Sequence, residues 1–393
     1  MTVADTAPRA LSEEAFAAHV DALAADPARR NQLTGLLREN HPIYDGRGTA
    51  TVVRMRGWIL LALARAGLSE ATLIFVLEEL DTGLDPYLVA AAARALRSYP
   101  QPNETLAPFV ARALKQIRYH DEPVSLERYG EYATAPSGPS AVSELLATIA
   151  WLGPHARPAL PELEELRAQR GLSRKLRLEF DRMLNAIRGP ARTPPCCGGE
   201  APPGGSIVLH APELRRDLGP AESVVLQDHG GRSVTFGEFF RGQPSIVVFF
   251  YTRCDNALKC SLTIAKLAKL QTLLEAKGGA GRIRTAAITY DPAFDLPERL
   301  RIYGKDRGVR MDRDHRMLRA VENNHALRAH FELGVNFIES LVNRHRVELY
   351  ILDARGRVAV SFERIHWDEQ EVVGRATELL NEQAYCGRMA GAG

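Results

Sequence analysis

Two cysteines and one histidine are the residues whose types and spacing best fit chemistry in this chain. Cys254 and Cys260 lie just past a strongly apolar run, 245–251, and His345 lies just before a second strand-like run, 347–353. Two thiolates and an imidazole are ligands suited to copper. The same two thiols can instead cycle between dithiol and disulfide. These residues therefore predict either a copper site or a thiol–disulfide centre.

The charge state expected for the cysteines serves both chemistries. Cys260 opens a predicted helix, and the dipole of a helix stabilises a thiolate at its N-terminus. Lys259 and Arg253 flank the pair and favour the same state. Thiolate is the form that binds a metal and also the form that attacks a disulfide, so charge alone does not separate the two interpretations.

The segment from residue 206 onward reads as alternating strands and helices. We expect strands at 223–226, 233–235, 245–251, 282–290, 347–353 and 358–362, and helices at 261–277, 296–307, 324–333 and 368–381. The first two strands flank a Gly-Gly turn, which is typical of a hairpin. This order is typical of an α/β thioredoxin-like domain, in which helices cover a mixed sheet.

Four features along 206–386 carry a resemblance to a known family. They are the strand end Val247–Cys254, the helix opening Cys260–Thr263, the Asp-Pro segment Ala287–Pro297 with Gly304 beyond it, and His345 ahead of the run Tyr350–Gly356. In the order and spacing of these features the segment resembles the Sco/SenC family, the thioredoxin-fold copper chaperones linked to cytochrome oxidase assembly.

The resemblance implies a ligand set and a partner. Cys254 and Cys260 would be thiolate ligands of copper, as Cu(I) or Cu(II), and His345 would be the imidazole ligand. The recipient would be a protein, such as a copper-dependent enzyme. Two features depart from the family: five residues separate the cysteines instead of the usual three, and the membrane anchor usual in the family is not seen here.

Five other residues are candidates for accessory roles. Asp291 and Asp295 stand at a strand end, where Asp-Pro turns are mostly structural. Cys196 and Cys197 are adjacent thiols in a Pro/Gly-rich stretch; they can bind or relay a metal, exchange with the main pair, or be incidental. Cys386, near the C-terminus, can resolve a mixed disulfide or be incidental.

The first half of the chain reads as a series of helices. We expect them from residue 11 and at 54–66, 69–80, 86–98, 103–117, 140–152, 159–167 and 173–187, with a long loop at 118–139. Short paired helices, about 40 residues per pair, predict a HEAT-like α-solenoid, with a plain helical bundle as the alternative. The expected segments are the helical repeat domain 1–188, the linker 189–205, the thioredoxin-like domain 206–386 and a tail 387–393.

Composition and charge argue against several classes. The 393-residue chain has a formal net charge of +2, which gives no electrostatic case for binding nucleic acid. No stretch approaches the ~18 apolar residues of a membrane span, and the N-terminus lacks the basic and then apolar pattern of a secretory signal. We therefore expect a cytoplasmic protein, in which five cysteines suit metal or redox chemistry better than a disulfide framework.

Taken together, these features favour a copper-binding chaperone that delivers copper to a partner protein, with the helical domain recognising that partner. The first alternative is a thiol:disulfide oxidoreductase that uses Cys254 and Cys260. The second is a non-catalytic scaffold whose C-terminal domain has lost its chemistry, an alternative that the longer cysteine loop keeps open.

Overall fold

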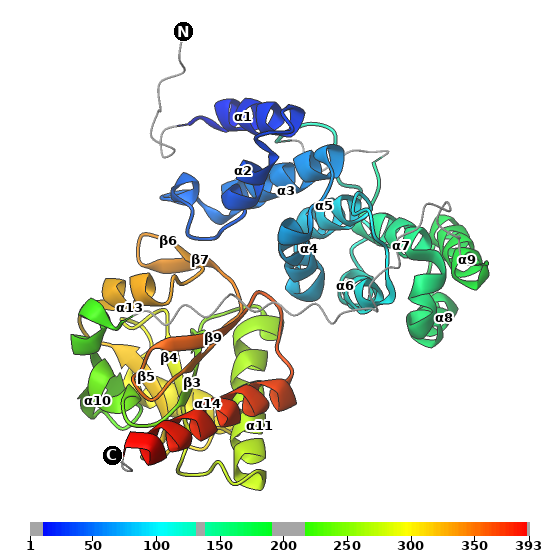
Figure 1. Cartoon of the computed structure of the whole chain (residues 1–393). Helices are drawn as coiled ribbons and strands as arrows, with labels where there is room; N and C mark the ends of the chain where they lie inside the picture. The colour runs from blue at the N-terminus through cyan, green and yellow to red at the C-terminus, as the bar shows by residue number, and fades with distance from the viewer. Residues whose placement is uncertain (1–10, 131–137, 191–216, 391–393) are drawn as a thin grey trace. The chain divides into compact units, whose positions relative to one another are not determined.

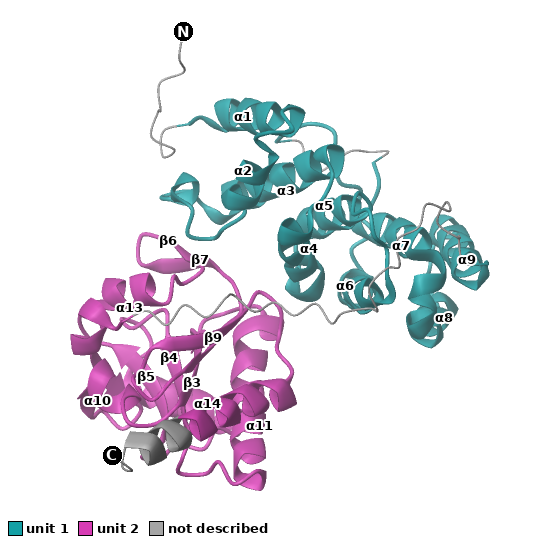
Figure 2. Cartoon of the chain, in the orientation of Figure 1, with its two compact units in different colours: residues 1–208 teal, residues 209–393 magenta. Residues whose placement is uncertain are grey.

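The computed structural model describes residues 11–130, 138–190 and 217–390, with side chains up to residue 382. The chain divides into two compact units, Met1–Val208 and Leu209–Gly393 (Figure 2). Cys196 and Cys197, the thiols of the expected linker, lie outside the described residues. Within the described part, no helix is both long enough and apolar enough to cross a membrane.

The first unit consists of α-helices, which confirms the prediction of a helical N-terminal region (Figure 1). Its α-helices are α1 (Glu13–Ala25), α2 (Arg30–Leu36), α3 (Thr49–Ala66), α4 (Glu70–Thr82), α5 (Pro86–Leu96), α6 (Ala107–Ile117), α7 (Ala141–Leu152), α8 (Leu160–Ala168) and α9 (Arg174–Arg188). Helix α2 was not predicted, because its seven residues include a glycine and bury only two leucines.

Capping side chains explain where several of these helices begin. A serine or aspartate before the first turn accepts a hydrogen bond from a backbone N–H three residues on, which satisfies a donor that the helix leaves unpaired. The caps are Ser12 on Ala15 (3.1 Å), Asp85 on Leu88 (3.0 Å), Ser140 on Ser143 (3.1 Å) and Ser173 on Leu176 (3.2 Å).

The helices of the first unit contact one another in alternation. Helix α1 contacts α3, α3 contacts α5, α5 contacts α7 and α7 contacts α9, while α4 contacts α6 and α6 contacts α8. Consecutive pairs such as α4 and α5 also pack together. The HEAT-like solenoid stays a prediction, because neither these contacts nor an internal sequence repeat identifies that repeat class.

A buried arginine ties the first unit together. Arg56, on α3, is 0% exposed, and its Nη2 lies 3.2 Å from Glu39 and 3.1 Å from Glu79. Its Nη1 also donates to the carbonyl of Leu37 at 2.6 Å. Both carboxylates are buried, so all three charges depend on one another for compensation.

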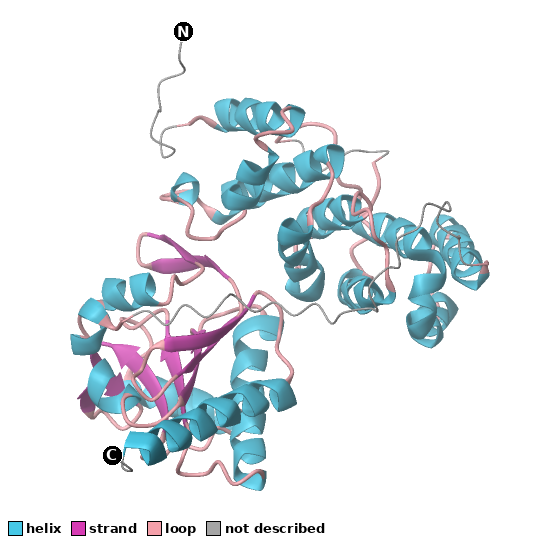
Figure 3. Ribbon diagram, viewed as in Figure 1, coloured by secondary structure: helices cyan, strands magenta, loops and turns pink. Residues whose placement is uncertain are grey.

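The second unit is a seven-stranded mixed sheet with helices on both faces (Figure 3). The strand order is β2-β1-β5-β4-β3-β8-β9. Strand β4 runs parallel to its two neighbours, β3 and β5, and the other neighbouring pairs of this sheet are antiparallel. The strands are β1 (Val225–Asp228), β2 (Ser233–Thr235), β3 (Ser245–Phe250), β4 (Arg284–Thr289), β5 (His315–Ala320), β8 (Glu348–Leu352) and β9 (Val358–Glu363). A separate hairpin is formed by β6 (Val335–Ile338) and β7 (Leu341–His345). The thioredoxin-like α/β class is confirmed.

Strand β3 shows why the central run is apolar without interruption from Ile246 to Phe250. Ile246, Val248 and Phe250 face the core beneath α11 (Leu262–Ala276), α12 (Pro297–Asp306) and α14 (Glu369–Ala390). Val247 and Phe249 face the opposite core, with α10 (Phe236–Phe240) and α13 (Asn324–His330). A strand covered on both faces has no solvent side, so polar residues do not alternate along it.

Several parts of the second unit differ from the prediction: helix α10, strand β5 and the hairpin of β6 and β7 were not expected, and helix α14 is longer than expected. Strand β5 was missed because Arg316 and Arg319 interrupt its apolar pattern. His315 on this strand is 2% exposed, and its Nδ1 lies 2.8 Å from the hydroxyl of Thr285. Helix α14 continues to Ala390, through much of the segment expected as a tail. Cys386 lies on this helix, beyond the described side chains.

Replacing Arg56 with Met is expected to destabilise the helical unit by about 3–5 kcal/mol, because it leaves two buried carboxylates without their cation. The measurement is urea unfolding of the full chain followed by circular dichroism. The matched control is Arg188→Met, whose ion pair with Glu164 is about half exposed and should contribute about 0–1 kcal/mol. Equal unfolding midpoints for the two variants would contradict a structural role for the Arg56 cluster.

Candidate metal centre

The pairing of β3 with β8 brings the predicted ligands to one edge of the sheet. The two strands are antiparallel, with Val248 opposite Leu349, so the end of β3 lies beside the start of β8. Cys254 lies in the loop that follows β3, and His345 ends β7 just before β8 begins. Residues 91 positions apart in the sequence therefore meet.

Cys254, Cys260 and His345 converge on one point. The Nε2 atom of His345 lies 3.5 Å from the Sγ atom of each cysteine. All three ligand atoms lie within 4.8 Å of one another, and the described residues contain no second group of His, Cys, Asp or Glu with this spacing. Cys260 and His345 are buried, whereas Cys254 is partly exposed.

The imidazole of His345 is oriented for binding a metal through Nε2. Its Nδ1 lies 2.9 Å from the carbonyl oxygen of Arg346. A carbonyl can only accept, so Nδ1 carries the proton and Nε2 presents its lone pair to the two sulfurs. The rings of Tyr251 and Tyr290 lie against the imidazole, each with its centroid 5.4 Å away, and limit its rotation.

The two thiols hold their protons unequally. A hydrogen bond from the Cys260 thiol is the largest of the causes that lower the pKa of Cys254 to about 3. Burial, and then the neighbouring Cys254, raise the pKa of Cys260 well above its ordinary value. Cys254 is therefore the thiolate near neutral pH. The expectation that a helix N-terminus makes Cys260 the thiolate is wrong, because complete burial outweighs the dipole.

The two aspartates named from the sequence lie outside the cysteine–histidine cluster and anchor the loop before it. Arg253, which was expected to favour the thiolates, forms an ion pair with Asp291 instead. Asp295 accepts hydrogen bonds from the backbone N–H of Thr252 (3.1 Å) and from the hydroxyls of Thr252 and Thr289. These contacts fix the path of the chain just before the first cysteine.

The long spacing between the cysteines is accommodated by a π-helical turn, 257–261, which carries Cys260 and leads into α11. The carbonyl of Leu258 lies 2.7 Å from Nε2 of His366, which tethers the outside of the turn. The ammonium of Lys259 donates to the carbonyl of His345 at 2.7 Å, which tethers the inside. The extra residues thus form a turn that is tied at two points.

A buried polar network beside His345 was missed in the sequence. Glu348 is 0% exposed and accepts hydrogen bonds from Nε of Arg346 (2.8 Å), from the hydroxyl of Tyr350 (2.7 Å) and from the hydroxyl of Tyr290. Tyr290 joins this network to the imidazole that it contacts. The available signal was two oppositely charged residues, Arg346 and Glu348, at the start of the strand-like run 347–353.

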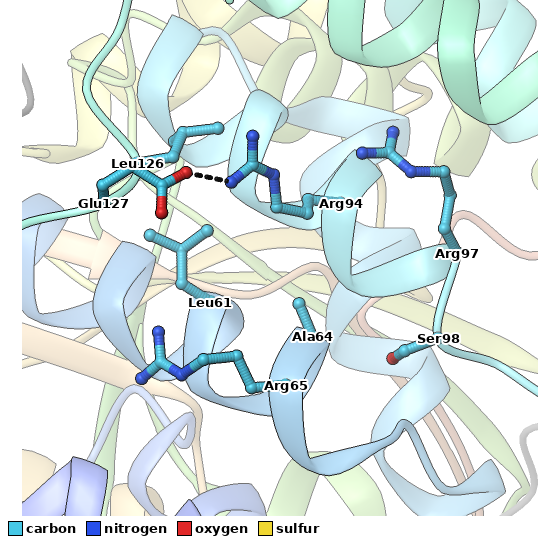
Figure 4. A pocket seen from close by; sticks show the side chains of 8 residues that line it. All are labelled: Leu61, Ala64, Arg65, Arg94, Arg97, Ser98, Leu126 and Glu127. Carbon is cyan, nitrogen blue, oxygen red and sulfur yellow. Dashed lines mark hydrogen bonds and ion pairs between the residues drawn. The ribbon is translucent and has the colours of Figure 1, made fainter.

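A cavity of about 270 Å³ opens in the helical unit (Figure 4). It is lined by Leu61, Ala64, Arg65, Arg94, Arg97, Ser98, Leu126 and Glu127. Arg94 and Arg97 share the buried carboxylate of Glu144, at 2.8 and 2.5 Å. Arg94 also pairs at 2.9 Å with Glu127, whose side chain is 83% exposed. The cavity is therefore bordered by guanidinium groups, and Glu127, the outer partner of Arg94, faces solvent.

The proton distribution predicts how Cys254 reacts in the metal-free protein. In a chain with Cys196, Cys197 and Cys386 replaced by Ser, iodoacetamide should modify Cys254 at a nearly constant rate from pH 8 to pH 5, because its thiolate persists until the pH approaches about 3. Peptide mapping by mass spectrometry gives the site and rate. An ordinary thiol, with a pKa of about 8.5, would slow roughly tenfold per pH unit over that range, and such a decline would contradict the assignment.

The donor set and its arrangement fit a soft metal such as copper, because two sulfurs and a neutral imidazole nitrogen meet in a largely buried site. No curated protein matches the chain. Similar solved structures include a SCO1/SenC lipoprotein from Bacillus anthracis (18% identity, 42% of this chain and 96% of that chain, TM-score 0.37). Arabidopsis thaliana ScoI with copper bound (17%, 40% and 96%, 0.34) and yeast Sco1 with copper bound (23%, 39% and 84%, 0.32) are also similar. The SCO1/SenC family model matches residues 221–381, so this part of the chain is a SCO1/SenC family domain.

Proposed function

We propose that the C-terminal domain binds one copper ion through Cys254, Cys260 and His345 and that the protein delivers this ion to a protein partner. The convergence of two sulfurs and one imidazole nitrogen within 4.8 Å of one another carries the proposal. Thiolates suit Cu(I), and an added neutral imidazole accommodates Cu(II). The match of this segment to the SCO1/SenC family supports the same function.

The three ligands differ in exposure to solvent, and this difference determines from which side a recipient protein can reach the copper ion. Cys254 is partly exposed, whereas Cys260 and His345 are buried. A thiolate of the recipient can therefore approach from the side of Cys254 and replace it while the two buried ligands still hold the cargo ion. Near neutral pH Cys254 has already lost its proton, so binding should release about one proton per ion, from Cys260.

Titration of the reduced protein with Cu(I) and with Cu(II) tests the proposal. We expect one copper ion per chain in the wild type, loss of tight binding in Cys254→Ser and Cys260→Ser, and a larger loss for Cu(II) than for Cu(I) in His345→Ala. Calorimetry in two buffers of different ionisation enthalpy gives the number of protons released. The matched controls are Cys386→Ser and the exposed His325→Ala, which should bind as the wild type does. Absence of copper binding in the reduced wild type would remove the proposal.

Thiol–disulfide exchange is the second candidate, and one observation favours it: a partly exposed thiolate, Cys254, lies beside a buried thiol, Cys260. Cys254 would attack a disulfide of the partner and release one partner thiol. Cys260, after losing its proton, would displace the second thiol and close an internal disulfide. The partner disulfide would gain two electrons, and the cysteine pair would lose two.

Oxidised glutathione separates this candidate from copper delivery. Under the exchange mechanism Cys260→Ser accumulates a mixed disulfide of Cys254 with glutathione, and His345→Ala still reacts, because the imidazole is not part of the exchange. The mixed disulfide is detected as added mass. Copper binding without exchange would leave delivery as the function, and absence of both would support the non-catalytic scaffold.

We infer that the helical unit recognises the partner through an acidic segment. The cavity near Arg94 supports this inference, because Glu127, the outer partner of Arg94, is 83% exposed, and ion pairs exposed to solvent contribute only about 0–1 kcal/mol. A partner carboxylate can take the place of Glu127 at the guanidinium of Arg94. Glu144 keeps Arg94 in position, since the carboxylate is buried between Arg94 and Arg97.

A fluorescein-labelled peptide, Gly-Asp-Glu-Leu-Leu-Gly, is the probe for this surface. We expect Glu127→Gln to bind it severalfold more tightly than the wild type, because the internal competitor is gone. We expect Arg94→Met to bind it about tenfold more weakly, because a charge-assisted hydrogen bond is lost. The measurement is fluorescence anisotropy at low salt. The matched control, Arg167→Met, removes a paired arginine outside the cavity; equal losses in the two arginine variants, or no gain in Glu127→Gln, would contradict the assignment.

A further inference from the structure

Lys259 is a buried cation inside the proposed copper site. It directly precedes Cys260 in the π-helical turn, is 7% exposed, and its ammonium donates to the carbonyl of His345 at 2.7 Å. Its side chain therefore joins the backbone of the second cysteine ligand to the backbone of the histidine ligand. A lysine is rarely buried to this extent, because desolvation of an ammonium is unfavourable unless nearby groups compensate for it.

The charge of Lys259 acts on the ligands. The hydrogen bond from its ammonium to the carbonyl of His345 holds this charge between the cysteine turn and the histidine strand. Arg253, by contrast, directs its guanidinium to Asp291, and Arg346 pairs with Glu348 and Glu363. Of the two cations that flank the cysteines in the sequence, Arg253 and Lys259, it is Lys259 that contacts the histidine strand.

The two oxidation states of copper respond differently to such a cation. With both cysteines as thiolates and His345 neutral, the ligands and Cu(I) together carry one negative charge, whereas the ligands and Cu(II) are neutral. A nearby positive charge stabilises the first arrangement more than the second, and the difference is large where little water screens it. Other groups around the site shift both states, but removal of Lys259 changes the field for each by one full charge.

We propose that Lys259 is a positioning residue that holds the Cys260 turn against the His345 strand and biases the site toward Cu(I). This inference rests on the proposed copper binding. On this proposal the longer segment between the cysteines has a function, because it forms the π-helical turn that places Lys259 against the carbonyl of His345.

Three substitutions separate the charge of Lys259 from its hydrogen bond. Lys259→Met removes both, Lys259→Gln keeps a donor without the charge, and Lys259→Arg keeps the charge. Affinity for Cu(I) is measured by competition with bathocuproine disulfonate, and affinity for Cu(II) by competition with nitrilotriacetate. We expect the ratio of Cu(I) to Cu(II) affinity to fall about tenfold in the Met and Gln variants, by the size of a one-charge interaction at a partly screened site, and to stay near the wild-type value in Lys259→Arg.

The matched control is Lys266→Met, which removes a lysine of α11 that pairs with Glu369 and should leave the ratio unchanged. The sulfur-to-Cu(II) charge-transfer bands in the absorption spectrum report whether the ligand set is retained in each variant. Equal losses of both affinities in Lys259→Met, or a ratio that does not change in the Met and Gln variants, would overturn the bias toward Cu(I). Failure of the wild type to bind copper would instead overturn the proposed function, so the two failures are distinguishable.

Discussion

The antiparallel register of β3 and β8 is the constraint on which the metal centre depends. It places the loop after β3 beside the segment before β8, so Cys254 in that loop meets His345 in that segment. Both strands are buried on both faces between two cores, so a shift of register would expose or misplace whole sets of buried side chains. The ligand geometry is thus set by the packing of the sheet, and a change deep in the sheet can alter it.

Buried charged residues around the two strands position the ligands, and the contact between the two cysteines sets their protonation. Asp291 and Asp295 fix the chain ahead of Cys254, and Glu348 organises the residues around His345. The Cys260 thiol donates to Cys254, which leaves one thiolate near the surface and one protonated thiol inside. A metal bound there would take the place of the shared proton, because both sulfurs would bind the ion. The same asymmetry suits disulfide exchange, which is why the two candidate functions share a site and differ in their need for His345.

The sequence predicted what depends on local pattern and missed what depends on packing. The apolar run of β3 and the Gly-Gly hairpin are local signals, and both are observed. Strand β5 was missed because Arg316 and Arg319 hide its period. The protonation of Cys260 could not be predicted, because the extent of its burial comes from the cores around it. The network of Glu348 required knowing that Tyr290 and Tyr350, from different strands, meet its carboxylate.

Cysteine spacing is a weaker guide to a metal site than strand register. The ends of the connecting segment are fixed, one by β3 and the other by α11, so extra residues must be absorbed between them. A π-helical turn absorbs them while keeping Cys260 next to His345, and single π-helical turns occur frequently at functional sites. Such a turn shifts the residues it carries around the helix axis, which here directs Lys259 inward to the carbonyl of His345. An insertion that looks disruptive in the sequence can thus preserve the ligands and add a charged group beside them.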